Sequence, residues 1–324
     1  MNDKNNDFYR APGSPEDPTA DYMVTATALN GKVRAISVTT KEICNRAMRI
    51  HGTSPSATAA LGRFLTGTLL LAANLKGEKD TLTANIRCEG PIQGMTAVCD
   101  AGGNIRGYVI EPVVETVLRE PGKLNVAAAV GKGLLTVVRD LGLKEPYVGS
   151  AELVSGEIGE DFAYYLGVSE QTRSVVSLGV LLDASGVLYA GGMMVQLMPD
   201  AGEDIIEYIE KRAGGGFPGI TFLLSEGMNP EKLLDLFLGD PDIRFLSGRT
   251  VQYCCPCSLD RMEQSLTALG VTELTELASD PNGIELECHF CGAKHRFEAK
   301  DVCRILENAT GIGARNGSKK ESSE

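Results

Sequence analysis

This sequence of 324 residues lacks both a long apolar run and an excess of basic residues, the features that would predict a membrane partner or a nucleic-acid partner. It has no apolar run of the roughly 18 residues that a membrane-spanning helix needs. Polar positions such as Thr66 and Asn74 interrupt its richest apolar stretch, residues 64–75. Its 31 basic residues are outnumbered by 43 acidic ones, which gives a net charge of −12. Because nucleic-acid binding relies on basic surfaces that displace counterions from phosphates, we expect neither a membrane nor a nucleic-acid partner.

We also expect residues 1–21 not to be a signal peptide. Residues 1–21 are polar and contain Pro12, Pro15 and Pro18, without the apolar segment that signal peptides carry. This composition predicts a disordered lead-in, and the polar residues 313–324 predict a disordered tail. Because nothing in the sequence indicates an oxidising compartment, we expect a cytoplasmic protein.

Catalytic side chains are scarce. Of the three histidines, His289 and His295 lie among the C-terminal cysteines, which leaves His51 alone for a Ser-His-Asp or Cys-His site. No G-x-S-x-G motif is present. The sequence therefore offers no familiar arrangement of nucleophile and base.

Two further patterns are interpreted as structural. The segment Gly131-Lys132-Gly133 lacks the spacing of a phosphate-binding P-loop and is expected to form a turn. Glu157, Glu160 and Asp161 form an acidic cluster, in which we interpret Glu157 and Glu160 as first-turn helix carboxylates favoured by the helix dipole. The sequence therefore predicts a protein that is not an enzyme.

The sequence does contain cysteines in the pattern of a metal site. Cys255 and Cys257 form a C-x-C pair, and Cys288 and Cys291 form a C-x-x-C pair, with a span between them long enough to fold back. Zinc prefers four ligands in a tetrahedron, and thiolates one or two residues apart can share the ion from one tight turn. We predict one Zn²⁺ per chain in the reduced form. Two structural disulfides, or unconnected buried cysteines, are the alternative interpretation.

Neighbouring residues are less suitable as ligands. The side chains of Cys254 and Cys255 are adjacent and tend to diverge, and His289 would have to turn away from its neighbours to bind. We expect His289 and His295 to be packed or solvated surface residues. Four thiolates close the coordination shell, whereas a catalytic zinc keeps one position open. The predicted site is therefore structural or redox-reactive.

The other cysteines occur singly among apolar neighbours. Residues of this kind usually behave as small buried hydrophobes with little reactivity. This interpretation applies to Cys44, Cys88, Cys99 and Cys303.

Hydrophobic patterning predicts an α+β fold. An Asn30-Gly31 turn centres a hairpin over residues 23–40, and helical spacing over residues 58–76 predicts a buried helix. Alternation over residues 80–114 predicts further hairpins. Later segments predict a helix over 157–169 and strands over 150–156, 173–182 and 187–197. Hairpins interrupted by helices favour an α+β domain, which we place at residues 22–200 as an N-terminal sheet-and-helix domain.

The sequence pattern changes after this domain, from alternating strands and helices to short amphipathic helices. Residues 201–252 are predicted to be a helical linker with amphipathic helices over 203–212 and 230–238. Their apolar faces must pack on something, because the segment is too small to hold its own core. Residues 253–312 are predicted to form a small C-terminal four-cysteine zinc domain.

Thiolate chemistry links the metal to a possible switch. Zinc holds the sulfurs deprotonated and nucleophilic, and each close pair can form a disulfide after one sulfur is oxidised to a sulfenic acid. Such oxidation would expel the metal. A structural zinc contributes on the order of 10 kcal/mol to the folding of a small module. Its loss should therefore unfold the module.

These residues resemble a known family, the redox-regulated 33 kDa heat-shock chaperones. The C-x-C and C-x-x-C spacing is similar, and the resemblance covers nearly the whole chain apart from the first twenty residues and the tail. Cys254 departs from the family pattern as an additional thiol beside the first pair. The other supporting stretches are Ala60-Leu61-Gly62-Arg63, Gly131-Lys132-Gly133-Leu134-Leu135-Thr136, Asp140-Leu141-Gly142-Leu143-Lys144-Glu145-Pro146-Tyr147, Ser155-Gly156-Glu157-Ile158, Glu160-Asp161-Phe162-Ala163-Tyr164-Tyr165 and Ser169-Glu170-Gln171.

The resemblance implies an ATP-independent holdase, a chaperone that binds unfolding proteins and prevents their aggregation under oxidative stress. It implies inactivity in the reduced, zinc-bound form and activity after oxidation, when the zinc module and the adjacent linker unfold. Homodimerisation of the oxidised form is a further implication. The disulfides of that form are expected to join Cys255 with Cys257 and Cys288 with Cys291.

Melting of the linker would uncover apolar side chains that can bind an unfolded client protein. The candidates are Ile205, Ile209, Leu233, Leu236 and Phe237. Two other classes remain open from the sequence, a constitutive interaction protein with a purely structural zinc and a zinc-dependent hydrolase. Loss of zinc on peroxide treatment separates the first class from a switch, and replacement of His51 and Glu160 tests the second.

Overall fold

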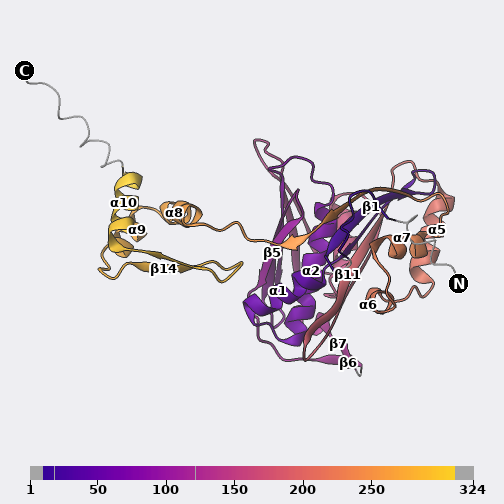
Figure 1. Cartoon of the computed structure of the whole chain (residues 1–324), viewed down its shortest axis with the longest axis horizontal. Coiled ribbons are helices and arrows are strands. Elements are labelled where there is room, and N and C mark those ends of the chain that lie inside the picture. Colours follow the sequence, from indigo (N-terminus) through magenta and orange to yellow (C-terminus); the bar gives the residue numbers. More distant parts are fainter. Residues whose placement is uncertain (1–9, 18, 121, 311–324) are drawn as a thin grey trace, which may run out of the picture. The chain divides into compact units, whose positions relative to one another are not determined.

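The computed structural model describes residues 10–17, 19–120 and 122–310. The chain divides into two compact units, the first ending at Cys254 and the second starting at Cys255. Figure 1 shows the sheets and helices of the first unit in indigo to orange and those of the second towards yellow. Within the described residues, no helix is both long enough and apolar enough to span a bilayer.

The first unit mixes strands and helices along the chain, which confirms the predicted α+β class. Its elements in chain order are β1 (Tyr22–Ala28), β2 (Val33–Thr39), α1 (Lys41–His51), α2 (Pro55–Ala72), β3 (Thr81–Cys88), β4 (Gly94–Asp100), β5 (Asn104–Val109), β6 (Leu118–Glu120), β7 (Lys123–Leu124), α3 (Val126–Val130), β8 (Gly133–Asp140), β9 (Tyr147–Glu152), α4 (Gly159–Ser169), β10 (Ser174–Asp183), β11 (Gly186–Leu197), α5 (Glu203–Gly214), α6 (Ile220–Ser225), α7 (Pro230–Leu238), β12 (Arg244–Thr250) and β13 (Gln252–Tyr253).

A five-stranded sheet has the order β10-β11-β2-β1-β12, and all its neighbouring strands are antiparallel. β1 and β2 form the predicted hairpin, and Asn30 and Gly31 in its turn have φ angles of 55° and 79°. Asn and Gly tolerate this left-handed region best. Strand alternation turns Met23 to one face of the sheet and Val24 to the other. Both side chains are buried, so both faces of the sheet are covered.

α2 lies between the two large sheets of the first unit. It shares one apolar core with strands of both sheets, and all its residues except Pro55 and Arg63 are buried. Packing is tight at Gly67, where a Cβ atom would lie 2.3 Å from the ring of Phe162. The predicted buried helix over residues 58–76 is confirmed, although both of its ends lie a few residues earlier.

A six-stranded sheet with the order β13-β5-β4-β3-β8-β9 covers the other side of α2. Its strands are antiparallel except for β13, which pairs in parallel with β5. The hairpins predicted over residues 80–114 are confirmed, and Gly103 in one turn has a φ of 82°. Gly131-Lys132-Gly133 connects α3 to β8, as expected for a turn.

Residues 201–252, which we predicted to be a linker, belong to the first unit and pack on its five-stranded sheet. α5, α6 and α7 cover the face of the five-stranded sheet opposite α2, and β12 pairs with β1 at its edge. Leu233 and Phe237 of α7 are completely buried. The helices predicted over 203–212 and 230–238 correspond to α5 and α7, whereas α6 and β12 were not predicted.

Residues 10–17 differ from the predicted disordered lead-in. Ala11 is buried, and the backbone of this segment is hydrogen-bonded to Gly248 of β12. The polar, proline-rich composition indicated disorder, but it held no information about Glu231, a buried carboxylate far along the chain that binds this segment. Residues 1–9 and 18 of the lead-in, and the predicted tail 313–324, lie outside the described residues.

The second unit has a small core of its own. Its elements are α8 (Leu259–Thr267), α9 (Val271–Ala278), β14 (Ile284–Glu287), β15 (Lys294–Phe297) and α10 (Ala299–Thr310). β14 and β15 form an antiparallel hairpin. The buried apolar side chains of this core are Leu266, Leu274, Phe297, Val302 and Ile305.

Candidate metal centre

The structure brings together the four cysteines that the sequence singled out. The sulfur atoms of Cys255, Cys257, Cys288 and Cys291 all lie within 4.8 Å of one another. The Sγ atoms of Cys255 and Cys288 are 3.7 Å apart, and those of Cys257 and Cys291 are 3.2 Å apart. A tetrahedron of thiolates about 2.3 Å from zinc has edges of about 3.8 Å. The group therefore has nearly the dimensions of a four-thiolate zinc site.

The second cysteine pair is held by the loop between β14 and β15. The N–H of Cys288 donates to the carbonyl of Ala293 at 2.9 Å, which closes the loop. The N–H of Gly292 then donates to the carbonyl of Cys288 at 2.8 Å. Gly292 has a φ of 68°, a conformation that glycine adopts without strain. This tight turn directs the thiols of Cys288 and Cys291 to the same side.

The first pair lies in the segment between β13 and α8. Ser258 follows it and accepts a hydrogen bond from the N–H of Arg261 at 3.3 Å, as an N-cap that starts α8. Pro256 separates the two thiols and restricts the backbone between them. Cys254 is half-buried at the end of the first unit, and its N–H donates to the carbonyl of Ile105 at 2.9 Å. It is not part of the group of four.

The environment affects the four thiols unequally. Burial raises the pKa of Cys255 well above its ordinary value, and it raises the pKa of Cys257 to about 11. Burial acts in the same direction on Cys288, but backbone hydrogen bonds from Phe290 and Cys291 outweigh it and the pKa is lowered. A divalent cation in the centre of the group would displace the remaining protons, because a coordinating thiol is deprotonated.

The three histidines have other positions. His289 is exposed in the β14–β15 loop, and His295 is half-buried on β15, opposite Leu286. Neither belongs to the cysteine group. His51 lies in the first unit, with Nε2 2.9 Å from the carbonyl of Gly107 and 3.2 Å from the hydroxyl of Tyr253. Burial lowers its pKa.

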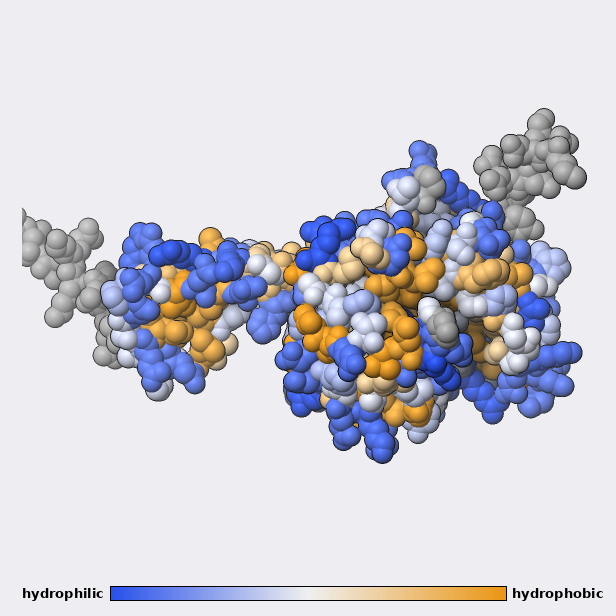
Figure 2. Space-filling view, turned by 90° about the horizontal axis from the view of Figure 1, so that it is seen from below, coloured by the Kyte–Doolittle hydropathy of each residue, from blue (hydrophilic) through white to orange (hydrophobic). Residues whose placement is uncertain are grey.

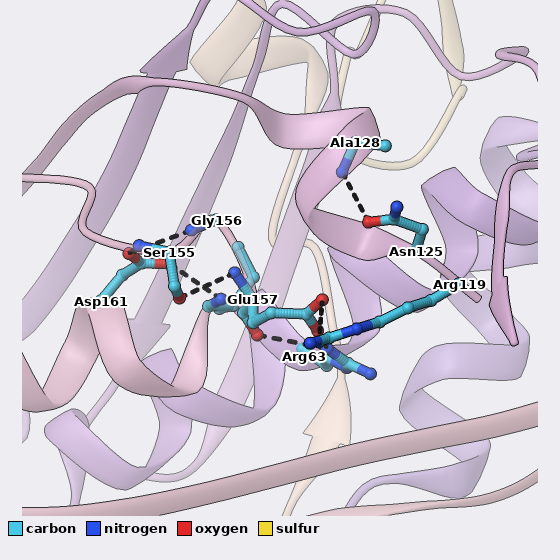
Figure 3. Close-up of polar contacts among 9 residues, drawn as sticks. Arg63, Arg119, Asn125, Ala128, Ser155, Gly156, Glu157 and Asp161 are labelled. Carbon is cyan, nitrogen blue, oxygen red and sulfur yellow. Dashed lines mark hydrogen bonds and ion pairs between the residues drawn. The ribbon is translucent and has the colours of Figure 1, made fainter. Parts of the chain in front are cut away.

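Two members of the acidic cluster around the start of α4, Glu157 and Asp161, make polar contacts that Figure 3 shows. Glu157 lies before the helix, which corrects its predicted position in the first turn. Its carboxylate is 2.5 Å from Arg63 of α2 and 4.0 Å from Arg119 of β6, so it ties the loop before α4 to a helix and a strand. Glu160 is exposed in the first turn of the helix.

Asp161 is the buried member of this cluster. Its two carboxylate oxygens accept hydrogen bonds at 2.8 to 3.2 Å from the N–H groups of Val154, Ser155, Gly156 and Ile158. This arrangement holds Ile158 at a φ of 72°, which is unusual for a β-branched residue. The carboxylate thus fixes the loop before α4.

Most of the predicted client-binding side chains lie on the inner faces of the linker helices α5 and α7. Ile209, Leu233 and Phe237 are buried against the five-stranded sheet, and Ile205 packs at the edge of the same core. Leu236 is 38% exposed, so its predicted place on the covered face is wrong. A helix turns about 100° per residue, which rotates Leu236 away from the face that holds Leu233 and Phe237.

The prediction for the single cysteines holds in part. Cys44 and Cys99 are buried in the core of the first unit, and Cys88 is half-buried beside it. Burial raises the pKa of all three thiols, that of Cys99 to about 12. Cys303 is exposed on α10, which contradicts the predicted burial. Its neighbour Val302 points into the core of the second unit. Because adjacent helical residues point in different directions, Cys303 faces away from this core.

Comparison with known proteins gives a consistent result. The sequence model of a family described as "Hsp33 protein" matches residues 21–298. A protein of Ruminiclostridium cellulolyticum named "33 kDa chaperonin" is 45% identical over 287 residues, which cover 89% of this chain and 98% of that protein. A protein of the same name from Bacillus cereus is 42% identical over 290 residues, covering 89% and 99%.

A solved structure is also similar. The crystal structure of the 33 kDa chaperonin (heat shock protein 33 homolog) of Thermotoga maritima superposes with a TM-score of 0.81 at 36% identity. The match covers 90% of this chain and 99% of that one. Similarity therefore extends over both units and leaves out mainly the ends of the chain.

Proposed function

The chain belongs to the Hsp33 family, as its sequence resemblance predicted, and we propose that its four-cysteine centre is the redox switch of a chaperone. The protein is a redox-regulated molecular chaperone. The observation that carries the proposed switch is the group of four thiols within 4.8 Å of one another. A closed group of this kind suits a switch better than a catalytic metal, because it leaves no coordination position open.

Zinc is the ion that fits this group. Thiolates are soft ligands, and a set of four thiolates in a tetrahedron is typical of zinc. When bound, zinc would keep the sulfurs as thiolates and join the β14–β15 loop to the segment before α8. The residues that we propose to hold one ion in the reduced form are Cys255, Cys257, Cys288 and Cys291.

A peroxide is the oxidant of the proposed switch. One thiolate attacks hydrogen peroxide, forms a sulfur–oxygen bond and breaks the oxygen–oxygen bond, which gives a sulfenic acid and hydroxide. A second thiol then attacks the oxidised sulfur, forms a disulfide and releases water. Each disulfide thus delivers two electrons to one peroxide molecule. Formation of both disulfides removes all four ligands.

We propose that the disulfides form within each close pair, Cys255 with Cys257 and Cys288 with Cys291. Pairing across the site is the alternative, because Cys255 also lies near Cys288 and Cys257 near Cys291. Once the first disulfide has formed, the metal is lost and the two arms can separate. Thiols one or two residues apart then remain at high effective concentration, since closing a short loop costs little entropy.

Loss of the ligands should unfold the second unit. Its core has five buried apolar side chains, and a structural zinc contributes on the order of 10 kcal/mol in small modules. The linker region, residues 201–252, precedes this unit directly in the chain. We propose that oxidation also releases α5, α6, α7 and β12 from the five-stranded sheet, so that the switch exposes a large apolar surface.

The exposed surface is the proposed client-binding site. It comprises the inner faces of the linker helices, with Ile205, Ile209, Leu233 and Phe237, and the sheet face beneath them, with residues such as Val24. Leu236 is already exposed and lies at the margin. Burial of apolar surface supplies the binding free energy, so no nucleotide is needed.

The partners follow from this mechanism. Unfolding proteins are the proposed clients, because they expose apolar side chains that folded proteins bury. The same surface would allow two oxidised chains to associate as a homodimer. We place the protein in the cytoplasm, where thiols are kept reduced until oxidative stress occurs.

A constitutive interaction protein with a purely structural zinc is the second candidate. The first unit exposes apolar side chains even with the linker helices in place, and Figure 2 shows hydrophobic patches on its surface. Among these residues, Val113, Tyr147 and Val148 are 73%, 61% and 63% exposed. A fixed surface of this kind would bind partners independently of oxidation.

An aggregation assay separates the two candidates. Light scattering from a heat-unfolded client is followed with the reduced protein and with the peroxide-treated protein, and released zinc is titrated in the same samples. The switch predicts suppression of aggregation only after treatment, in parallel with the loss of about one zinc per chain. Equal suppression by both forms, or activation without zinc release, would reject the switch. Mass spectrometry of the oxidised protein identifies which cysteines are paired.

A further inference from the structure

The N-terminal strap, residues 10–17, packs on the linker region in a way that the family match does not cover. The family model's match starts at residue 21, so the strap lies outside it. Ala11 is nevertheless only 3% exposed. The strap contacts two elements, α7 and β12, and both belong to the region that leaves the sheet in the proposed function.

The first anchor is Glu231, a carboxylate in the first turn of α7 with no exposed surface. One of its oxygens accepts hydrogen bonds from the N–H of Ala11 at 3.0 Å and from the hydroxyl of Ser14 at 2.9 Å. Its other oxygen accepts from the hydroxyl of Tyr22 on β1 at 2.7 Å. Two of these three bonds therefore come from the strap. Hydrogen bonds to a buried charge are among the stronger ones in proteins.

The second anchor is Gly248 on β12. Its N–H donates to the carbonyl of Pro12 at 2.6 Å. The two backbones approach closely, because a Cβ atom on Gly248 would lie 2.3 Å from Oγ and 2.7 Å from N of Ser14. Gly13 has a φ of 87°, and a Cβ there would lie 2.5 Å from the carbonyl oxygen of Gly248. Glycine is thus required on both sides of this contact.

The rest of the strap is held less closely. Pro15, Glu16 and Asp17 line a cavity of about 790 Å³ together with residues of α1, β11 and α7, among them Lys41, Tyr189 and Lys232. The chain rejoins the sheet at Tyr22. The attachment of the strap is therefore concentrated at residues 11–14, where one short segment binds a helix and a strand at once.

We propose that the strap is an intramolecular clasp that holds α7 and β12 on the five-stranded sheet and so raises the oxidant dose needed for activation. The inference rests on the proposed function, because a clasp regulates the protein only if α7 and β12 must leave. The contacts at Glu231 and Gly248 exist only in the closed form. By linkage, they favour that form by their full interaction free energy.

Two variants remove the clasp by different routes. Deletion of residues 2–17 removes the strap, and deletion of residues 2–9 is its control because it leaves the strap in place. Gly248→Ala displaces the strap from β12, since the three atoms nearest to the added methyl group all belong to Ser14. Gly214→Ala is the matched control in the same linker region, where an added methyl group meets nothing within 4 Å.

Hydrogen exchange of the reduced, zinc-loaded full chain measures the clasp without any chaperone assay. We expect exchange in α7 and β12 to be at least about tenfold faster in the 2–17 deletion and in Gly248→Ala, because loss of charge-assisted hydrogen bonds favours opening to this extent. Both controls should match the unchanged protein. Unchanged exchange in the two clasp variants would overturn the proposal.

A double variant shows whether Gly248→Ala acts through the strap. In the chain that lacks residues 2–17, the substitution should change exchange in β12 less than twofold. An effect of equal size with and without the strap would mean that the methyl group disturbs β12 itself, and it would overturn the assignment of the anchor.

A separate measurement tests whether the clasp raises the oxidant dose needed for activation. The peroxide concentration for half-maximal suppression of client aggregation should fall severalfold in the 2–17 deletion, and not in the 2–9 deletion. Faster exchange without a change in this concentration would overturn the regulatory role. Failure of the proposed function gives a different result, since no chain would then gain activity with peroxide while the difference in exchange would persist.

Discussion

α2 in the first unit and α10 in the second bury apolar surface to very different extents. Every residue of α2 except Pro55 and Arg63 is buried, because sheets cover the helix on both sides. α10 buries only Val302 and Ile305. The first unit can therefore be stable through its core alone, whereas the second has little core for its length.

This contrast explains why a redox switch can act on one unit and spare the other. Removal of a metal ligand should remove most of the folding free energy of a unit with so small a core. The apolar core between the two sheets of the first unit does not depend on these ligands. The linker region is intermediate, because it has a buried apolar face but depends on the sheet beneath it.

The largest expected effect is that of Cys288→Ser on the second unit. Loss of one of four thiolates should abolish zinc binding and unfold residues 255–310, with a loss on the order of 10 kcal/mol for this unit. The first unit should retain its protected amides. Zinc analysis and residue-resolved hydrogen exchange of the reduced variant check both statements.

Cys254→Ser is the matched control, because Cys254 lies beside the first pair but outside the group of four. The variant should bind zinc like the unchanged protein and keep the second unit folded. Metal loss equal to that of Cys288→Ser would contradict the proposed ligand set. A first unit that unfolds together with the second would contradict the comparison itself.

A smaller effect is expected from Phe237→Ala in α7. Phe237 has no exposed surface and meets Phe217 edge to face, with 5.0 Å between the ring centroids. Removal of a buried phenyl ring costs about 3–5 kcal/mol. The linker region should open more readily, and half-maximal activation should need less peroxide, while zinc affinity stays unchanged.

Leu236→Ala is the control for this substitution. Leu236 lies on the same helix but is 38% exposed, so its truncation should cost less than about 1 kcal/mol. Hydrogen exchange of α7 and zinc titration of both variants provide the comparison. If Phe237→Ala released zinc from the reduced protein, opening of the linker region would cause the loss of the metal, and the proposed order, with loss of the ligands first, would be wrong.

Sequence-based prediction succeeded where the residues that determine a feature lie close together in the sequence. The β1–β2 hairpin was predictable because Asn30 and Gly31 specify its turn locally. The cysteine group was predictable because each pair is close in sequence. The helix of residues 58–76 was predictable because apolar spacing is also a local property.

Features set by distant partners could not be predicted in this way. The strap is ordered by Glu231, more than 200 residues away. β12 belongs to the sheet only because β1 offers it an edge. Leu236 and Cys303 were misassigned because their apolar character can be read from the sequence, whereas the direction of the face on which the core lies cannot. Local patterns specify elements, whereas burial depends on what packs against them.

The smallest effect concerns pH, and it should have opposite signs in the two units. Protons compete with zinc for thiolates, so acid should weaken metal binding in the second unit. In the first unit, burial raises the pKa of Asp21 from 3.8 to about 7, partly offset by hydrogen bonds from the N–H groups at the start of α1, while the nearby Glu42 adds to the increase. This carboxyl should make the first unit more stable as the pH falls.

The sign follows from proton linkage. A carboxyl with a higher pKa in the folded chain binds its proton more tightly when folded, so its contribution to stability is complete below pH 3.8 and is lost as the pH rises towards 7. Asp21→Asn imitates the neutral form and removes this dependence. Between pH 8 and pH 5, the unchanged protein should gain about 2 kcal/mol of first-unit stability relative to Asp21→Asn. Denaturant unfolding of both chains at the two pH values measures this difference, which cancels the contributions of all other carboxylates. A difference that stays constant with pH would mean that Asp21 is charged throughout this range, held by the N–H groups of α1, and the two units would then no longer respond to acid in opposite directions.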